Sequence, residues 1–245
     1  MTELTKRDGE RYHRQMLIEG WGEEGQKKLK KSKAFIAGAG GLGSPAAIYL
    51  AVGGIGHIKI VDKDVPELSN LNRQILHTEA DIGTPKAKSA EESLKALNPD
   101  ITIEAVKETI TEDNVHDLVN GSDIIIDCMD NFPTRYLLNK TAIKLGIPFV
   151  HGSIWGIEGR TTFIIPGKTP CLRCIFPESP PSELFPVLGA APGVIGSIQA
   201  TEALKYFTGV GKLLTDRLLI YDGERTEFNE VGVSRDPNCI DCSNL

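Results

Sequence analysis

The sequence lacks the features of a secreted or membrane-bound protein. No window in its 245 residues approaches the roughly 20 unbroken apolar residues of a membrane span. The first residues, MTELTKRDGERYHRQ, are polar and charged and contain no apolar core for a signal peptide. Cysteine is scarce, and five cysteines are a poor basis for disulfides in a reducing compartment. These absences predict a cytoplasmic protein with no membrane partner.

The sequence also lacks an excess of positive charge. The chain has 27 lysines and arginines against 33 aspartates and glutamates, which gives a formal net charge of -6 at pH 7. That balance disfavours a sequence-independent interaction with nucleic acid, so no nucleic-acid partner is expected. The longest basic cluster, KKLKKSK at 27–33, is better explained as the solvated face of a helix.

The rest of the composition is that of an ordinary globular protein, 40% hydrophobic and 24% charged. A chain of 245 residues is long enough for one large α/β domain with a buried core. Because the sequence contains no internal repeat and no convincing linker, we expect a single domain over residues 1–245.

Short apolar runs alternate with helical patterns through the first half of the chain. The run AFIAGAG at 34–40 ends in glycines, a helical pattern follows, and HIKIVDKD at 57–64 has the composition of a second strand. Further strands are predicted at 101–106, 122–127 and 147–151, with helices near 84–97, 111–119 and 133–146. This alternation predicts a Rossmann-like, doubly wound α/β fold with a mostly parallel sheet covered on both faces.

The pattern changes in the second half of the chain. A strand is predicted at 159–167 and a hairpin at 217–231, so we expect antiparallel strands to extend the same sheet. The apolar run at 193–209 predicts a long helix that ends at a glycine. Between them, residues 177–192 are rich in proline and irregular, which is typical of a crossover segment.

A glycine loop, G-A-G-G-L-G, joins the first predicted strand to the helix that follows it. Glycine lets the backbone turn tightly and approach a phosphate, and the N–H groups at the helix start face the anion. The loop glycines are Gly38, Gly40, Gly41 and Gly43. Asp62 ends the second strand, where a carboxylate can accept hydrogen bonds from ribose hydroxyls. NAD and ATP would use the same glycines and the same acid, so this motif does not select the nucleotide.

Two cations favour ATP. A dehydrogenase needs little positive charge beyond the pyrophosphate loop, whereas transfer from ATP needs several cations to hold a triphosphate. Arg73 offers a planar fork for phosphate oxygens. Thr84 is predicted to cap a helix with Pro85 at its first position, so Lys86 lies in the first turn. A lysine there opposes the helix dipole unless a phosphate binds beside it. The alternative is a solvated lysine near a helix end.

Acidic and amide side chains follow the apolar strand SDIIIDCMDN. Asp127, Asp130 and Asn131 lie at its end, and this is the edge of the sheet where doubly wound folds bind ligands. Mg²⁺ prefers one or two carboxylates together with phosphates and water, so Asp130 is a candidate magnesium ligand. Capping of the following helix is the alternative for Asp130 and Asn131, and each residue could have a different role.

Four of the five cysteines form two C-x-x-C pairs. Cys171, Cys174, Cys239 and Cys242 supply the four thiolates of a closed, tetrahedral structural zinc site. Free thiols and a redox dithiol are the alternatives. The fifth cysteine, Cys128, ends an apolar strand, and we predict a buried thiol there rather than a nucleophile.

Taken together, these segments resemble one family. The motifs RYHRQ, GAGGLG, VDKD, SNLNRQ, GTPK and DCMDN occur in an order and spacing similar to those of the MoeB/ThiF family, relatives of the ubiquitin-activating enzymes. The resemblance extends from about Arg11 to Cys242 and agrees with the zinc site. It implies that the nucleotide or magnesium is contacted by Gly41, Asp62, Asn70, Arg73, Lys86, Asp130 and Asn131. It also implies that Arg14 reaches the phosphates in a neighbouring subunit, and therefore a homodimer.

The activity that the resemblance implies is ATP-dependent adenylation of the C-terminal Gly-Gly carboxylate of a ubiquitin-like, β-grasp sulfur-carrier protein. Carriers of the molybdopterin synthase small-subunit or ThiS type are of this kind. The chain stops just after the second cysteine pair, so we expect no fused sulfurtransferase domain and a separate sulfur donor protein. The crossover 177–192 contains no cysteine, and Ser182 is a poor substitute, which speaks against a covalent link to the carrier.

Apolar residues in and beside the crossover are candidates for recognising the body of the carrier, or for packing at the dimer interface. They are Phe176, Leu184, Phe185 and Val187. Other functions also remain open: adenylation of a small-molecule or tRNA-linked carboxylate, an NAD-dependent oxidoreductase, or a non-catalytic nucleotide-binding scaffold. Molybdopterin synthesis, thiamine synthesis, tRNA thiolation and protein conjugation share one activation chemistry, so the sequence does not select a pathway.

Overall fold

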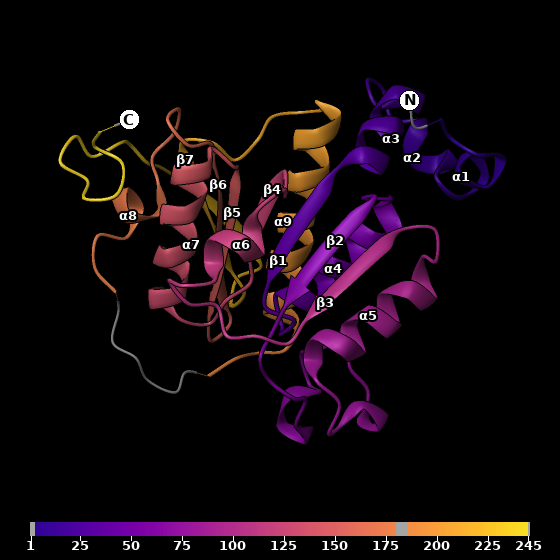
Figure 1. Cartoon of the computed structure of the whole chain (residues 1–245). Helices are drawn as coiled ribbons and strands as arrows, with labels where there is room; N and C mark the ends of the chain where they lie inside the picture. The colour runs from indigo at the N-terminus through magenta and orange to yellow at the C-terminus, as the bar shows by residue number, and fades with distance from the viewer. Residues whose placement is uncertain (1–2, 180–185, 245) are drawn as a thin grey trace.

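An eight-stranded sheet runs through the computed structural model, which describes residues 3–179 and 186–244 (Figure 1). The parallel strands are β1 (Lys33–Ala37), β2 (His57–Val61), β3 (Thr102–Val106), β4 (Ile124–Asp127) and β5 (Phe149–Trp155). The antiparallel strands are β6 (Glu158–Ile164), β7 (Arg217–Asp222) and β8 (Glu227–Gly232). Their order is β3-β2-β1-β4-β5-β6-β7-β8, so the predicted Rossmann-like sheet with an antiparallel extension is confirmed.

Two layers of helices cover this sheet. One face carries α4 (Gly43–Gly53), α5 (Lys86–Leu97) and α9 (Ala190–Thr208), and the other carries α6 (Val115–Val119) and α7 (Phe132–Leu145). The short α8 (Leu172–Ile175) packs against α7. At the N-terminus lie α1 (Lys6–Arg11), α2 (His13–Met16) and α3 (Gly22–Lys31). None of the helices in residues 3–179 and 186–244 combines the length and apolar character needed to cross a bilayer.

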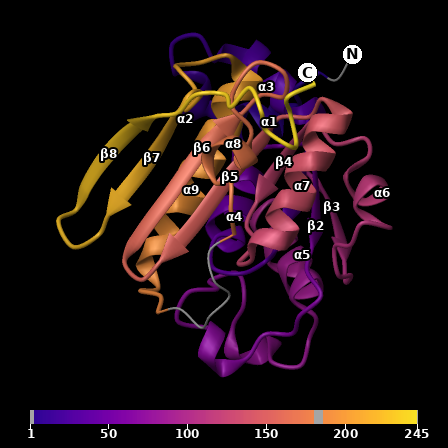
Figure 2. The same ribbon diagram turned by 90° about the vertical axis from the view of Figure 1, so that its left-hand side faces the viewer.

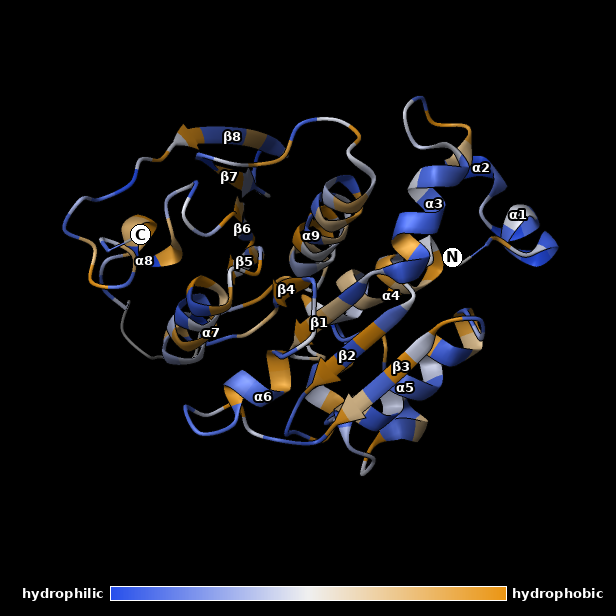
Figure 3. Cartoon of the chain, turned by 45° about the horizontal axis from the view of Figure 1, so that its top comes forward, coloured by the Kyte–Doolittle hydropathy of each residue, from blue (hydrophilic) through white to orange (hydrophobic). Residues whose placement is uncertain are grey.

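The parallel strands are apolar on both sides because both of their faces are covered. In β1, Ala34 and Ile36 enter the core beneath α4 and α9, whereas Phe35 and Ala37 enter the core beneath α7. All four are fully buried. In Figure 3, β4 is coloured as hydrophobic while α1 is mostly hydrophilic. Period-two alternation thus divides one apolar strand between two cores.

The second half of the chain also follows its prediction. The long helix α9 ends at Gly209, which takes the left-handed conformation with φ 79°. Strands β7 and β8 form a hairpin that projects at one side of the sheet (Figure 2). The basic cluster 27–33 lies mostly on α3, which buries Leu29 and exposes Lys28 and Lys31 to solvent, as the sequence indicates.

Candidate active site

A cavity of about 560 Å³ opens at the carboxyl ends of β1, β2 and β4. It lies at the point where the strand order reverses, between β1 and β4, which is where doubly wound folds bind ligands. Its volume is within the range of small-molecule sites. Of the seven residues that the resemblance implies contact nucleotide or magnesium, six line it: Gly41, Asp62, Arg73, Lys86, Asp130 and Asn131.

The glycine loop forms one wall of this cavity. Gly38 has φ +97°, and a Cβ atom there would lie 2.8 Å from the Cys128 carbonyl oxygen, so only glycine fits. A Cβ atom on Gly43 would lie 2.0 Å from the Gly38 carbonyl oxygen. Asp62 fixes the loop from the second strand, because its carboxylate accepts hydrogen bonds from Ala39 N at 2.8 Å and from Asp64 N at 2.8 Å.

Arg73 and Lys86 enter the cavity from two different segments. The Arg73 guanidinium donates to the Ser69 carbonyl at 3.0 Å and to Asn72 Oδ1 at 2.9 Å, and these bonds orient it. Lys86 is only 6% exposed, and its ammonium lies 3.6 Å from an Asp64 carboxylate oxygen. A nearly buried lysine with one distant carboxylate partner is well placed to receive an anion.

The helix that carries Lys86 begins one residue later than predicted. Its N-cap is Pro85, whose ψ of 134° is not helical, and Lys86 is the first residue of α5. The prediction that Thr84 caps this helix is wrong, because the Thr84 N–H donates to the Asp81 carbonyl in the preceding turn η2 (Glu79–Asp81). Lys86 therefore lies at the very start of the helix, where a cation is disfavoured until an anion binds.

Asp130 and Asn131 divide the two roles that the sequence left open. Asn131 is the N-cap of α7, since its Oδ1 accepts from Thr134 N at 2.9 Å. Its Nδ2 donates to Asp130 Oδ1 at 3.2 Å. The capping amide thereby holds an exposed carboxylate in the cavity wall, and this carboxylate is the hard oxygen ligand that Mg²⁺ prefers.

A further cation, Arg135, lines the cavity and was not predicted. Its Nη2 donates to the Met129 carbonyl at 2.6 Å and to the Gly152 carbonyl at 3.2 Å. Its Nε lies 3.6 Å from the fully buried Asp127 carboxylate. Like Lys86, it is a basic residue in the first turns of a helix, and that signal would have identified it.

His151 completes a buried polar cluster with Asp127 and Arg135. Asp127 and His151 lie on the neighbouring strands β4 and β5, and Asp127 Oδ2 is 2.7 Å from His151 Nδ1. Burial lowers the pKa of His151 even though Asp127 opposes that shift. Arg135 already balances the Asp127 charge, so a neutral imidazole keeps the cluster neutral overall.

This cluster should make stability depend on pH. Below about pH 6.5 the unfolded chain binds a proton at His151 that the folded chain does not bind, so stability falls as pH decreases. The free energy of unfolding, measured with urea between about pH 7 and pH 5, should fall less steeply for His151→Gln than for the parent, by up to about 1.4 kcal/mol per pH unit. Equal slopes would contradict a neutral His151, and the exposed His116 provides the control variant His116→Gln.

Two predicted residues lie away from this cavity. Asn70 closes the short helix η1 (Leu68–Asn70), where its Oδ1 accepts from Glu67 N at 3.2 Å. Arg14 belongs to α2 and is exposed. Because α3 leads directly into the start of β1, α2 lies at the opposite end of the sheet from the glycine loop. Within the described residues, neither Asn70 nor Arg14 is part of the cavity wall.

Cys128 is buried beneath the cavity, as predicted. Burial raises the pKa of its thiol well above the ordinary value, with the Asp127 charge adding to that shift. A thiol that stays protonated is not a nucleophile.

The other four cysteines meet at one point. Their sulfur atoms all lie within 4.8 Å of one another. Three of the Sγ–Sγ distances are 3.8 Å for Cys171–Cys174, 3.6 Å for Cys171–Cys239 and 3.5 Å for Cys174–Cys242. A tetrahedral zinc with Zn–S bonds of about 2.3 Å requires sulfurs roughly 3.8 Å apart. These residues therefore fit zinc and form no disulfide with one another.

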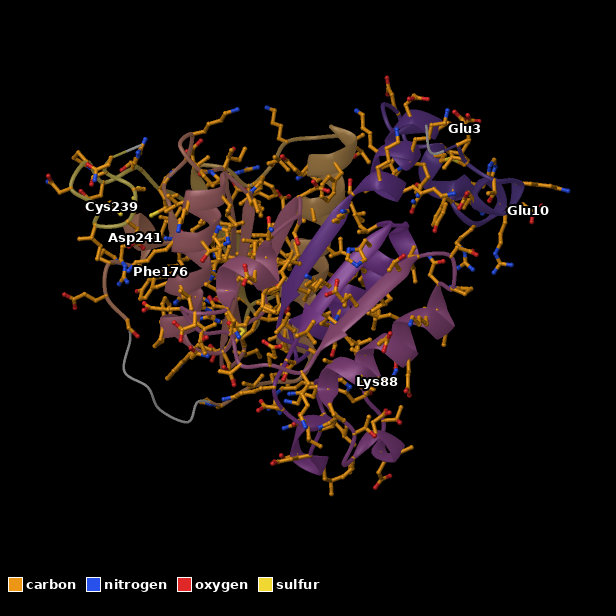
Figure 4. All side chains as sticks on the ribbon, viewed as in Figure 1. Glu3, Glu10, Lys88, Phe176, Cys239 and Asp241 are labelled. Carbon is orange, nitrogen blue, oxygen red and sulfur yellow. The ribbon has the colours of Figure 1, made fainter. Side chains whose placement is uncertain are left out.

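Asp241, inside the second cysteine pair, attaches this four-cysteine cluster to α7. Its Oδ2 accepts from Asn139 Nδ2 at 3.0 Å, and Asn139 Oδ1 accepts from Leu172 N at 2.9 Å. Tyr136 donates its hydroxyl to the Phe176 carbonyl at 2.9 Å. Figure 4 shows Cys239, Asp241 and Phe176 gathered at one end of the molecule. The same helix thus carries Asn131 at one end and supports the cysteine cluster at the other.

The crossover returns to the cavity at its far end. Gly156 N donates to the Pro186 carbonyl at 2.8 Å, and Leu188 N donates to the Gly156 carbonyl at 2.9 Å. Val187 lines the cavity, and the Phe176 ring packs against Phe132 instead. Ser182, Leu184 and Phe185 lie outside the described residues.

Fold and site define the class of protein: a Rossmann-like nucleotide-binding protein whose cavity is lined by both basic and acidic side chains and whose C-terminal segment contributes to a cluster of four cysteines. The ThiF family model matches residues 12–241, so the chain belongs to the ThiF family.

Curated relatives agree with this assignment. The chain is 46% identical over 239 residues to the "SAMP-activating enzyme E1" of Haloferax volcanii, a match that covers 95% of this chain and 88% of the relative. It is 42% identical over 249 residues to the "Sulfur carrier protein adenylyltransferase" of Thermus thermophilus, with 97% and 92% covered. It is 45% identical over 249 residues to the "Adenylyltransferase and sulfurtransferase MOCS3" of Drosophila sechellia, covering 99% of this chain but 55% of that protein.

Solved structures share the fold. A crystal structure of E. coli MccB with MccA-N7isoASN superimposes with a TM-score of 0.88 at 23% identity, covering 98% of this chain and 76% of that one. At this level of identity the likeness concerns the fold alone.

Proposed function

We propose that this chain uses ATP to adenylate the C-terminal carboxylate of a ubiquitin-like sulfur-carrier protein. The observation that carries the proposal is the convergence of the glycine loop, Arg73, Lys86 and Asp130 on one cavity. The names of the curated relatives, an adenylyltransferase of sulfur carriers and a SAMP-activating enzyme, support the same activity.

The chemistry needs charge neutralisation more than it needs a side-chain nucleophile. The carrier's carboxylate has a pKa of about 3.5 and is ionised at neutral pH, so no general base is required. It attacks the α-phosphorus of ATP, an acyl–phosphate bond forms, and the bond to pyrophosphate breaks. The obstacle is to bring an anion to a polyanion, and the cations in the cavity wall lower that barrier. The cationic side chains are Lys63, Arg73 and Lys86, because the charge of Arg135 is already balanced by Asp127.

Asp130 is our proposed magnesium ligand. Its carboxylate is held by Asn131 at the N-terminus of α7, so it presents a fixed oxygen to the cavity. Bound magnesium would neutralise charge on the phosphates. In this proposal Asp62 holds the ribose, and Gly41 lets the phosphates approach the backbone.

We also propose a homodimer in which Arg14 of one chain serves the cavity of the other. Arg14 lies at the far end of the sheet from its own cavity, so it can act only on a second copy. The exposed apolar side chains that follow it, Leu17 at 66% and Ile18 at 46%, suit an interface between chains. Asn70 would join the site only by a local rearrangement of η1.

The remaining parts of the proposal concern the partners. The carrier is a β-grasp protein ending in Gly-Gly, a tail without side chains that fits a narrow cleft, and a separate protein donates the sulfur. Zinc bound to four reduced thiols suits the reducing cytoplasm. We propose that the ThiF-type domain extends over residues 1–245.

An NAD-dependent oxidoreductase is the competing function for this loop geometry. It would leave the buried Lys86 and the neighbouring Arg73 without a role. Calorimetry with Mg-ATP and with NAD separates these two functions, since an adenylating enzyme must bind Mg-ATP selectively and an oxidoreductase must bind NAD.

The test of the proposal is ATP–pyrophosphate exchange with magnesium, with and without a β-grasp protein ending in Gly-Gly. We expect exchange that depends on the carrier and disappears when its terminal Gly-Gly is removed. Tight ATP binding with no exchange for any such carrier would contradict the proposal and favour a small-molecule carboxylate or a scaffold.

A further inference from the structure

His77 lies beneath the glycine loop with both ring nitrogens engaged. The residue is 4% exposed. Its Nε2 lies 2.9 Å from the carbonyl oxygen of Ala39, which belongs to the glycine loop. Its Nδ1 lies 2.9 Å from Oγ of Ser89, which belongs to α5 one turn beyond Lys86. The imidazole therefore joins two of the segments that form the nucleotide cavity.

His77 is itself carried by a third segment of the cavity. The chain from 70 to 77 brings Arg73 and the buried Gln74 to the cavity wall. Just before His77 it is anchored at Leu76, whose N–H donates to Ser44 Oγ at 3.3 Å and whose carbonyl accepts from Ser93 Oγ at 2.8 Å. The contacts of Leu76 thus anchor the segment that carries Arg73, and the contacts of His77 link the end of this segment to the glycine loop and to α5.

The chemistry of its neighbours selects one tautomer. A carbonyl oxygen only accepts hydrogen bonds, so Nε2 must carry the proton that is donated to Ala39. Burial lowers the pKa of His77, and a neutral ring has a single N–H, so Nδ1 accepts from the Ser89 hydroxyl. Both ring nitrogens of the neutral imidazole then have a hydrogen-bond partner within the protein.

We propose that His77 is a positioning residue for nucleotide binding, holding the glycine loop, the Arg73 segment and the Lys86 helix in one mutual geometry. It acts through Ala39 and Ser89, and it is not among the described residues that line the cavity. The inference deepens the proposed function and rests on it for the identity of the nucleotide. Phosphate-binding groups on separate elements need such support, since small displacements weaken a site built from several of them.

Three substitutions of His77 distinguish the contribution of its bond to Ala39 from that of its bond to Ser89. His77→Gln keeps a donor where Nε2 lies, His77→Asn keeps a polar group only near Ser89, and His77→Phe keeps the ring shape without either bond. We expect the dissociation constant for Mg-ATP and its KM in pyrophosphate exchange to rise about 10-fold in the Phe and Asn variants. The Gln variant should recover most of this loss, and the KM for the carrier should stay within about twofold.

Controls make the result decisive. Zinc content and the unfolding midpoint without nucleotide report whether each variant folds. If His77→Phe does not fold, Ser89→Ala replaces it; this variant removes the Nδ1 partner together with the hydrogen bond of Ser89 to Asp81. His57→Gln at the start of β2 serves as the matched control. Calorimetry with Mg-ATP needs no carrier, so it tests His77 even if no carrier supports exchange. Unchanged ATP affinity in the folded variants, or equal losses for ATP and carrier, would overturn the proposal.

Discussion

Replacing Asp130 with alanine is expected to reduce carrier-dependent pyrophosphate exchange on the order of 10³-fold while changing the affinity for ATP only a few-fold. The carboxylate is exposed in the cavity wall and is fixed by Asn131 Nδ2 at 3.2 Å, so its loss removes a charge and the proposed metal ligand without leaving a buried gap. The other residues that we propose to contact the nucleotide lie on other elements, which is why binding should survive.

The measurement is exchange as a function of magnesium concentration, with ATP affinity followed separately by calorimetry. Glu108 is an exposed carboxylate in the same cavity wall, and Glu108→Ala is therefore the matched control. It should retain exchange within a few-fold. If Glu108→Ala lost as much exchange activity as Asp130→Ala, the loss would follow from removing negative charge from the cavity wall in general. This outcome would reject Asp130 as the specific metal ligand.

Disrupting the four-cysteine cluster is the second change with a large expected effect. Burial raises the pKa of the Cys171 and Cys242 thiols, so a divalent cation is needed to keep these two sulfurs ionised. Cys239→Ser should lose tightly bound zinc and lower the unfolding midpoint by roughly 10 °C, because the C-terminal segment is then no longer held to the middle of the chain.

Zinc content by atomic absorption and the unfolding midpoint test this result. Cys128→Ala provides the control, because Cys128 is buried outside the cluster and its variant should keep a full complement of zinc. Full zinc in Cys239→Ser, or a midpoint equal to that of the parent, would contradict a four-thiolate structural site.

The sequence predicts those parts of the site that are encoded locally. The glycine loop, Asp62 and Asp130 each follow a strand that is visible as an apolar run, and the ends of parallel strands meet at one edge of the sheet. The two cysteine pairs have a spacing that predicts their chemistry without any knowledge of the fold. Here local pattern and tertiary structure coincide.

The features that could not be predicted depend on contacts between distant segments. The Asp127–His151 pair joins residues 24 apart through the pairing of β4 with β5, and His77 meets Ala39 across 38 residues. The Thr84 cap failed for a different, local reason, because the Thr84 N–H donates to the Asp81 carbonyl three residues earlier and the helix begins at Lys86.

Burial differs strongly between the central and the edge strands of the sheet, and this difference affects which substitutions the protein can accept over evolutionary time. Every residue of β4 is buried, whereas every residue of β8 is exposed. Substitutions in β4 disturb two cores and the cavity floor, but those on the surface of β8 cost little stability. Glutamates at 227 and 230 along β8 discourage unwanted strand pairing. Lineages can therefore vary the outline of this hairpin freely while the nucleotide-binding half stays under constraint.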